Sequence, residues 1–205
     1  AAATPGWVEE VDLTADLEVA VAEPPSATAG LAYLLVDRQT RLAGVRTERY
    51  SRTVVRVLTA AGLEDAAQHQ FDFDPEYARA TLHHLRVWRG GRWEDRLEDA
   101  FVSVIQREAD LSRRLYDGGL TVLLLASDLQ VGDVVDFAST VEGVNPVHGG
   151  RYLEDLALGW SLPLAHRHIR VVGPAGATLV WRAFGVDLPG PQVTTTGGST
   201  TWLWQ

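Results

Sequence analysis

The sequence predicts an all-β fold, a large and mostly antiparallel β-sandwich with few short helical turns. Short runs rich in β-branched and aromatic residues recur along the chain, separated by turns that contain Gly or Pro. No stretch shows the apolar periodicity of a helix with several turns. With 205 residues and 46% hydrophobic content, the chain is long enough to bury a core without disulfides or metal.

The expected elements begin after a weakly patterned N-terminal lead, residues 1–29. Trp7 is an apolar anchor in this lead, and residues 11–22 suit either a short helix or an edge strand, ended by Pro24 and Pro25. Residues 30–205 are predicted to form a single β-sandwich domain, because no composition shift or fixed-period repeat divides them.

Strands dominate the remainder of the chain. The first is an apolar run that we expect Asp37 to close, and residues 62–67 suit a single helical turn. Gly90 and Gly91 form a hairpin-type turn into Trp93. The expected strands cover residues 31–36, 46–59, 68–73, 81–88, 101–105, 120–126, 134–141, 160–164, 168–172, 178–183 and 201–204.

The composition excludes several classes of protein. A formal net charge of −9 and the absence of a basic cluster argue against nucleic acid binding by this chain. Zero cysteine removes disulfides, thiolate metal sites and cysteine nucleophiles. No apolar run approaches the roughly 18 residues needed to span a bilayer. The small residues Ala1, Ala2 and Ala3 are compatible with the position after a cleaved export signal.

Histidines give little catalytic signal. His83 and His84 are adjacent in an expected strand, so we place them on opposite faces, with His83 hydrogen-bonded and half-buried on the more apolar face. The sequence also has no Gly-x-Ser-x-Gly elbow. We therefore predict no catalytic residue and no cofactor-binding residue.

Two alternating patterns are compatible with metal ligation. His166 and His168 would share one face of a strand, and so would Asp72, Asp74 and Glu76. A pair of half-buried histidines and a water-facing row of acids explain the same spacings. We therefore predict no metal site.

A candidate interaction surface comes from two places in the sequence. The densest charged segment suits either contacts with a partner domain or an internal network of salt bridges. Trp88 and Trp93 flank one turn and would form a carbohydrate-stacking surface if both rings faced outward. The residues of the candidate surface are Arg107, Glu108, Arg113, Arg114, Trp88 and Trp93.

An ordered set of local features gives the chain a family resemblance. In chain order the features are Tyr33-Leu34-Leu35, Phe73-Asp74-Pro75, Leu82-His83, Val87-Trp88-Arg89, Gln106-Arg107-Glu108, Tyr116-Asp117-Gly118, Val131-Gly132-Asp133, Asn145-Pro146-Val147 and Trp160-Ser161-Leu162-Pro163. Over roughly residues 30–185, this set resembles the domain of unknown function that precedes the core of bacterial transglutaminase-like proteins.

The resemblance implies a non-catalytic accessory domain whose partner is a downstream transglutaminase-like core of the same chain, with its own Cys, His and Asp. It also implies an extracytoplasmic location, in the periplasm or cell envelope. No catalytic residue is assigned to this domain in the family, so none transfers to this chain. An envelope-associated module that binds glycan or peptide remains the alternative.

Overall fold

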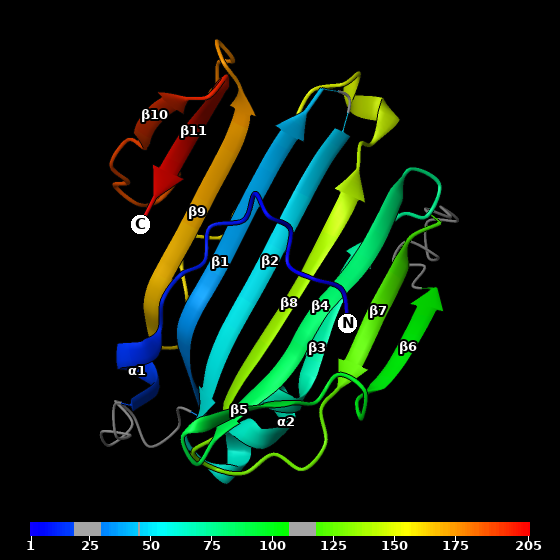
Figure 1. Ribbon diagram of the computed structural model, residues 1–205, viewed down its shortest axis with the longest axis vertical. Coiled ribbons are helices and arrows are strands. Elements are labelled where there is room, and N and C mark those ends of the chain that lie inside the picture. Colours follow the sequence, from blue (N-terminus) through cyan, green and yellow to red (C-terminus); the bar gives the residue numbers. More distant parts are fainter. Residues whose placement is uncertain (19–29, 45, 107–117) are drawn as a thin grey trace.

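Two β-sheets face each other in the computed structural model, which describes residues 1–18, 30–44, 46–106 and 118–205 (Figure 1). The eight-stranded sheet has the order β10-β11-β9-β1-β2-β8-β4-β5, and the three-stranded sheet has the order β3-β7-β6. The strands are β1 (Leu31–Ala43), β2 (Arg46–Val57), β3 (Gln68–Phe73), β4 (Ala78–Arg89), β5 (Arg92–Asp95), β6 (Phe101–Gln106), β7 (Leu120–Leu125), β8 (Val134–Gly143), β9 (Leu164–Pro174), β10 (Gln192–Thr196) and β11 (Ser199–Trp204). The prediction of an all-β sandwich is confirmed.

Helical structure among the described residues is limited to short turns. These are α1 (Thr14–Glu18), η1 (Ala60–Gly62), α2 (Leu63–Ala67) and η3 (Pro146–His148). The turn expected at residues 62–67 is therefore present. In η3, the Asn145 side chain accepts a hydrogen bond from the Val147 amide, an N-terminal cap that the Asn-Pro sequence favours.

The strand β1 lies in the middle of the eight-stranded sheet and is longer than predicted. It pairs antiparallel with β2 and parallel with β9, the one parallel pair among the described strands. Asp37 does not close the strand, because its carboxylate is buried against His168 of β9 and the ladder continues to Ala43. A buried partner for the acid thus overrides the strand-ending signal.

Two other expectations near the C-terminus are wrong, because residues 160–163 and 178–183 are irregular. The strand expected at 168–172 is present but begins earlier, at Leu164. Conversely, the Thr-rich tail forms the unpredicted strand β10, which pairs with β11 across Gly197 and Gly198. Both glycines have positive φ, at 60° and 82°, as a tight hairpin turn requires.

The main core fills the space between the two sheets. Leu85 and Val87 of β4 and Val122 and Leu124 of β7 belong to one buried apolar cluster, which α2 closes through Ala66. These side chains follow the period of two of a strand, so each strand contributes every second residue.

The opposite face of the eight-stranded sheet, called the outer face below, is covered by the N-terminal segment, residues 1–18. This segment crosses the strands on the side facing the viewer in Figure 1. Leu13 is buried there against Leu35, Val54 and Val134. Residues 1–18 therefore form neither an added sheet edge nor part of the core between the sheets.

Candidate functional site

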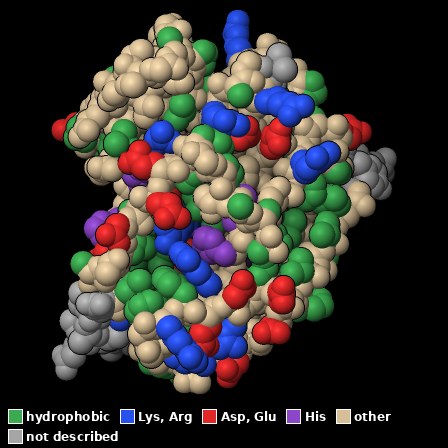
Figure 2. All heavy atoms as spheres, viewed as in Figure 1, with side chains coloured by type: hydrophobic (Ala, Val, Ile, Leu, Met, Phe, Trp, Pro, Cys, Tyr) green, Lys and Arg blue, Asp and Glu red, His purple; other side chains and the backbone are tan. Residues whose placement is uncertain are grey.

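A polar belt runs across the outer face of the eight-stranded sheet, beneath and beside the N-terminal segment. Its side chains come from strands far apart in sequence, and each is ionisable or an amide. The polar belt consists of Asp37 and Gln39 of β1, Arg52 of β2, His84 and Arg86 of β4, Asp136 of β8 and His168 of β9. Figure 2 shows this face, with charged and histidine side chains gathered along its middle and hydrophobic side chains on either side.

Asp136 is the centre of the larger half of the polar belt and is fully buried. Arg52 donates to both of its oxygens at 2.9 Å, from Nε and Nη2. His84 Nε2 lies 3.0 Å from Oδ1, and Arg86 Nε donates to Oδ2 at 2.9 Å. Burial by itself would raise the pKa of Asp136. The hydrogen bonds from His84 and Arg52, together with their charges, outweigh it and hold the pKa well below its usual value.

The smaller half of the polar belt is a buried pair with a shared amide. His168 Nδ1 lies 2.8 Å from Asp37 Oδ1, and Gln39 Nε2 donates to Asp37 Oδ2 at 2.9 Å. Within the described part of the chain, the other ring nitrogen of His168 has no partner. The Asp37 carboxylate therefore holds the His168 ring and the Gln39 amide in place, because each makes a hydrogen bond to one of its oxygens.

The polar belt can form hydrogen bonds to a peptide segment that lies across it. His84 and His168 each contact a carboxylate, which is how a catalytic histidine is oriented. Asp136, however, also binds two guanidinium groups, and the nearby Thr140 hydroxyl contacts His83 rather than His84. Across the described ranges, no group of three or more His, Cys, Asp or Glu is arranged to hold a metal ion.

The candidate residues named from the sequence fall into two groups. Arg107, Glu108, Arg113 and Arg114 lie outside the described residues. The other two are Trp88 of β4 and Trp93 of β5, which are cross-strand partners.

The rings of Trp88 and Trp93 meet edge to face at 5.4 Å, and both pack against the apolar cluster around Leu13. The Arg86 guanidinium lies over the Trp93 ring at 4.4 Å, so that ring face is not open to a sugar. The pair acts as a packing element of the outer face.

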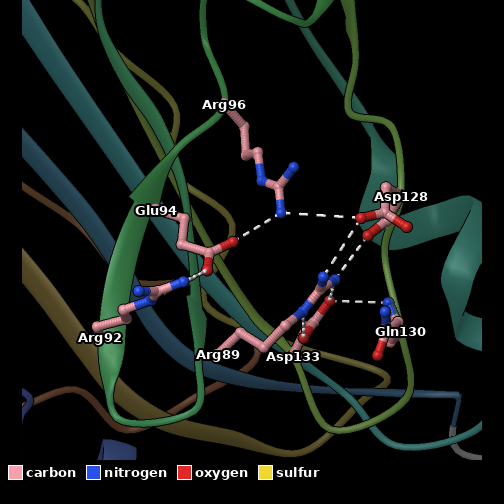
Figure 3. Close-up of polar contacts among 7 residues, drawn as sticks. All are labelled: Arg89, Arg92, Glu94, Arg96, Asp128, Gln130 and Asp133. Carbon is pink, nitrogen blue, oxygen red and sulfur yellow. Dashed lines mark hydrogen bonds and ion pairs between the residues drawn. The ribbon is translucent and has the colours of Figure 1, made fainter.

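A charged network close to this hairpin was not foreseen from the sequence. Arg89 donates to both oxygens of Asp133, at 2.9 and 2.7 Å, and to the Asp128 carbonyl at 2.6 Å (Figure 3). Arg96 bridges Glu94 and Asp128. The hydrogen bonds to Asp133 raise the pKa of Arg89 further above its usual value. This network joins the β4–β5 hairpin to the turn before β8, so Arg89 and Arg96 are already paired within the domain.

The two adjacent histidines of β4 are not on opposite faces, as the alternation of a strand predicted. The pairing of β4 with β8 shifts register between Leu82 and His84, a β-bulge that adds one residue. His83 is buried and hydrogen-bonded, with Nε2 2.7 Å from the Thr140 hydroxyl, and burial lowers its pKa. Because of the bulge, both histidines contact residues of the outer face.

The two patterns weighed for metal ligation have ordinary partners. His166 Nε2 lies 3.2 Å from Asp16, and His168 contacts Asp37 as described above. Asp72 accepts a hydrogen bond from the Thr121 hydroxyl at 2.5 Å. Asp74 accepts one from the Glu76 amide, as in an Asx turn.

An apolar edge strand distinguishes the three-stranded sheet. The apolar edge, defined as Phe101, Val102, Val104 and Ile105 of β6, is exposed on both sides of the strand, with Phe101 60% and Val104 55% exposed. Figure 2 shows hydrophobic side chains gathered on the side where β6 and β7 lie in Figure 1. No strand among the described residues pairs with the outer side of β6, which ends its sheet, so this side of the strand can accept a partner strand.

A groove of about 1070 Å³ lies beside β9 and β11, between the irregular segments 152–159 and 179–188. Its lining is mostly apolar and aromatic, with Glu154, Asp155 and Arg182 among it, and the Trp181 and Trp204 rings meet edge to face at 5.8 Å. The volume is at the upper end of the ~300–1,000 Å³ typical of ligand sites. No helix among the described residues is long and apolar enough to cross a membrane.

The fold and these surfaces define a β-sandwich domain with a buried polar belt and an exposed apolar edge. Residues 45–205 match the family described as "Domain of Unknown Function with solved-structure structure (DUF3857)". The chain therefore belongs to the DUF3857 family. The match begins after β1, although β1 lies in the middle of the eight-stranded sheet, so the folded unit extends beyond the matched residues.

Three solved structures are similar to this chain. A "putative protease" from Parabacteroides distasonis aligns with a TM-score of 0.68 and 13% identity, over 86% of this chain and 35% of that chain. A family IIIa CBD from Clostridium cellulolyticum aligns with a TM-score of 0.37 and 11% identity, over 58% of this chain and 75% of that one. Yeast LTA4 hydrolase in complex with bestatin gives 0.38 and 10%, over 95% and 30%. No curated protein matches the sequence.

Proposed function

We propose that this chain is a non-catalytic accessory β-sandwich domain that packs against, or positions, a downstream cysteine-dependent transglutaminase-like core. The observation that carries the proposal is the apolar edge on β6. Large apolar side chains exposed together on an open strand are unusual on a soluble domain unless a partner covers them. A neighbouring domain of the same polypeptide is a partner always present at high local concentration.

The register of the three-stranded sheet explains why the apolar edge suits a partner. Val102 and Val104 pair with Leu124 and Val122 of β7, which are buried in the core between the sheets. The side chains of Val102 and Val104 therefore point to the face of the three-stranded sheet that packs on the core. The eight-stranded sheet does not cover them, so they remain exposed. A docked domain would extend the existing core sideways across β6, because the apolar surface is already continuous with it.

Two further observations support an accessory role. The similar Parabacteroides chain is much longer, since this domain corresponds to 35% of it, and its description as a "putative protease" fits a fold of this kind within a larger polypeptide. This chain also contains no cysteine, so a cysteine nucleophile would have to come from another domain.

Hydrogen–deuterium exchange tests the proposal in the natural polypeptide that contains this segment, compared with residues 1–205 alone. We expect the β6 amides to be protected only in the longer polypeptide. Val193 of β10 is also exposed, at 57%, and serves as an internal control that should not change. Equal exchange at β6 in both proteins would contradict the docking, and peptidase or transamidase activity of residues 1–205 alone would contradict the non-catalytic role.

A second candidate function is an envelope-associated module that binds glycan or peptide. The groove beside β9 favours it, because the half-exposed ring of Trp181 lines an open apolar cavity together with Trp204. Calorimetry with peptidoglycan fragments and with apolar peptides tests it, with Trp181→Ala as the matched variant. Heat that disappears in that variant supports the module, and no heat at millimolar ligand counts against it.

An extracytoplasmic location, in the periplasm or cell envelope, belongs to both proposals. Fractionation of cells that express the natural polypeptide checks it. Recovery of the protein with cytoplasmic markers would contradict the location but would not contradict the docking proposal.

A further inference from the structure

We propose that the outer face of the eight-stranded sheet is a binding site for acidic peptides that carry a tryptophan and, six residues further on, a leucine. In this structure the site holds the chain's own N-terminal segment, with Trp7 and Leu13 at those two positions. The inference concerns a different face from the apolar edge and the groove, and it does not depend on the proposed docking.

Most of the contacts are hydrogen bonds between side chains of the sheet and main-chain atoms of the bound segment. The Gln39 amide accepts from the Glu9 N–H at 3.0 Å and donates to the Glu9 carbonyl at 2.7 Å, so it pairs with that residue as a neighbouring strand would. Further donors come from two other strands of the sheet, β2 and β9. They are Arg170 to the Trp7 carbonyl at 2.9 Å, Arg52 to the Val11 carbonyl at 3.3 Å, and Arg56 to the Asp16 carbonyl at 2.7 Å.

Two side chains supply the anchors. Trp7 donates from its indole nitrogen to Glu48 at 2.6 Å, and the Arg41 guanidinium lies over its ring. Leu13 fills an apolar depression made by Leu35 and Val54 and is 4% exposed. Deeply buried anchors of this kind usually carry most of the affinity of a peptide interface.

The charges of the two partners are complementary. The bound segment is rich in Asp and Glu, whereas Arg56 and Arg170 project towards it from the sheet. Glu9 and Arg170 form an ion pair at 3.3 Å. Complementary charge of this kind favours acidic ligands and rejects basic ones.

The site is held in shape by contacts that do not involve the segment. Asp136 fixes the Nε and Nη2 atoms of Arg52, which leaves Nη1 aimed at the bound main chain. Asp37 holds Gln39 in the same way. Preorganised donors lower the entropy cost of binding, and they stay in place when the site is empty.

The segment can leave the site without opening a sheet. It lies across the strands rather than along one, as Figure 1 shows, and it belongs to neither sheet. The main core, between the two sheets, is on the opposite side of the eight-stranded sheet. Release therefore exposes the apolar cluster around Leu35 and the polar side chains beneath the segment, but it leaves the main core covered, so a ligand in trans can replace the segment.

The test uses the full chain with a specific protease site placed within residues 19–29. After cleavage, a fluorescein-labelled peptide with the sequence of residues 1–18 is added and its anisotropy is measured. We expect saturable binding to the cleaved protein, at least about tenfold weaker binding to the uncut protein, and a loss of about tenfold or more when the peptide carries Trp7→Ala or Leu13→Ala.

Gln39→Ala and Thr40→Ala in the cleaved protein form a matched pair, because Thr40 is adjacent on β1 and contacts Glu154 on the other face. We expect Gln39→Ala to weaken binding about tenfold and Thr40→Ala to leave it unchanged. The peptide variants keep the test valid if Gln39→Ala does not fold. No binding by the labelled peptide, or equal binding by a scrambled peptide of the same composition, overturns the proposal.

Discussion

The two faces of the eight-stranded sheet solve the problem of burial in different ways. Where it faces the three-stranded sheet, the inner face buries the apolar side chains of Leu85, Val87 and Val135. The outer face buries charges, above all Asp136 with Arg52, beneath a segment that is not part of any sheet. The inner face is therefore stabilised by apolar packing. The outer face depends on buried ion pairs, in which the removal of one partner leaves the other charge buried and unpaired.

The largest effect is expected from breaking the charge cluster of the outer face. Asp136→Ala should lower the free energy of unfolding by about 4 kcal/mol, because it leaves Arg52 buried without its carboxylate partner. Urea denaturation measures the loss. The double variant Asp136→Leu with Arg52→Met should recover part of it, and a double variant no more stable than the single one would contradict this account.

A somewhat smaller effect is expected from a cavity in the inner face. Leu85→Ala should cost about 3 kcal/mol, since Leu85 is fully buried between the sheets and its neighbours cannot collapse into the space. The same denaturation experiment applies, and peptide binding at the outer face should be unchanged in the variant. Coupled losses would mean that the two faces do not act independently.

Acid should weaken the inner core through His69. Burial lowers the pKa of His69 from 6.5 to about 4, and its ring stacks on Phe137 at 4.9 Å. The unfolded chain therefore takes up a proton at higher pH than the folded one, so stability is lost as pH falls from 6.5 towards 4.

The full extent of this acid effect is about 3 kcal/mol, from 1.36 kcal/mol per pKa unit. Unfolding measured between pH 7 and 4 should show a smaller decline in His69→Leu than in the natural chain. His148→Gln is the control, because His148 lies in η3, away from this core. An unchanged decline in His69→Leu would show that other groups cause it.

The smallest effect on stability is expected at the apolar edge. Val104→Ser should change the free energy of unfolding by less than about 0.5 kcal/mol, because Val104 is 55% exposed. Its partner across the ladder, Val122, is buried, so Val122→Ser should cost clearly more. If Val104→Ser were equally costly, β6 would be part of the core rather than a surface for a partner.

Local signals in the sequence were sufficient for many elements. The strand Gln68–Phe73 and the β4–β5 hairpin with its two glycines follow from alternation and from turn chemistry, which depend on neighbouring residues. The apolar run at 101–105 was also identified as a strand, although its exposure was not.

The polar belt was missed, and one signal pointed to it. Asp136 lies in the run Val134-Val135-Asp136-Phe137, where a charge within an apolar strand indicates a buried partner. The identity of the partner was not available from the sequence, because Arg52 and His84 reach Asp136 only once β2, β4 and β8 are neighbours. The β-bulge at His83 likewise depends on the register of two strands.

By itself, the sequence determined the all-β class, the positions of most strands and turns, and the absence of a cysteine nucleophile. Only the tertiary structure decided the parallel pairing of β1 with β9, the burial of charge on the outer face and the exposure of β6. The reason is physical: alternation and turns are set by residues close in the chain, whereas register and burial are set by strands that meet after long loops close.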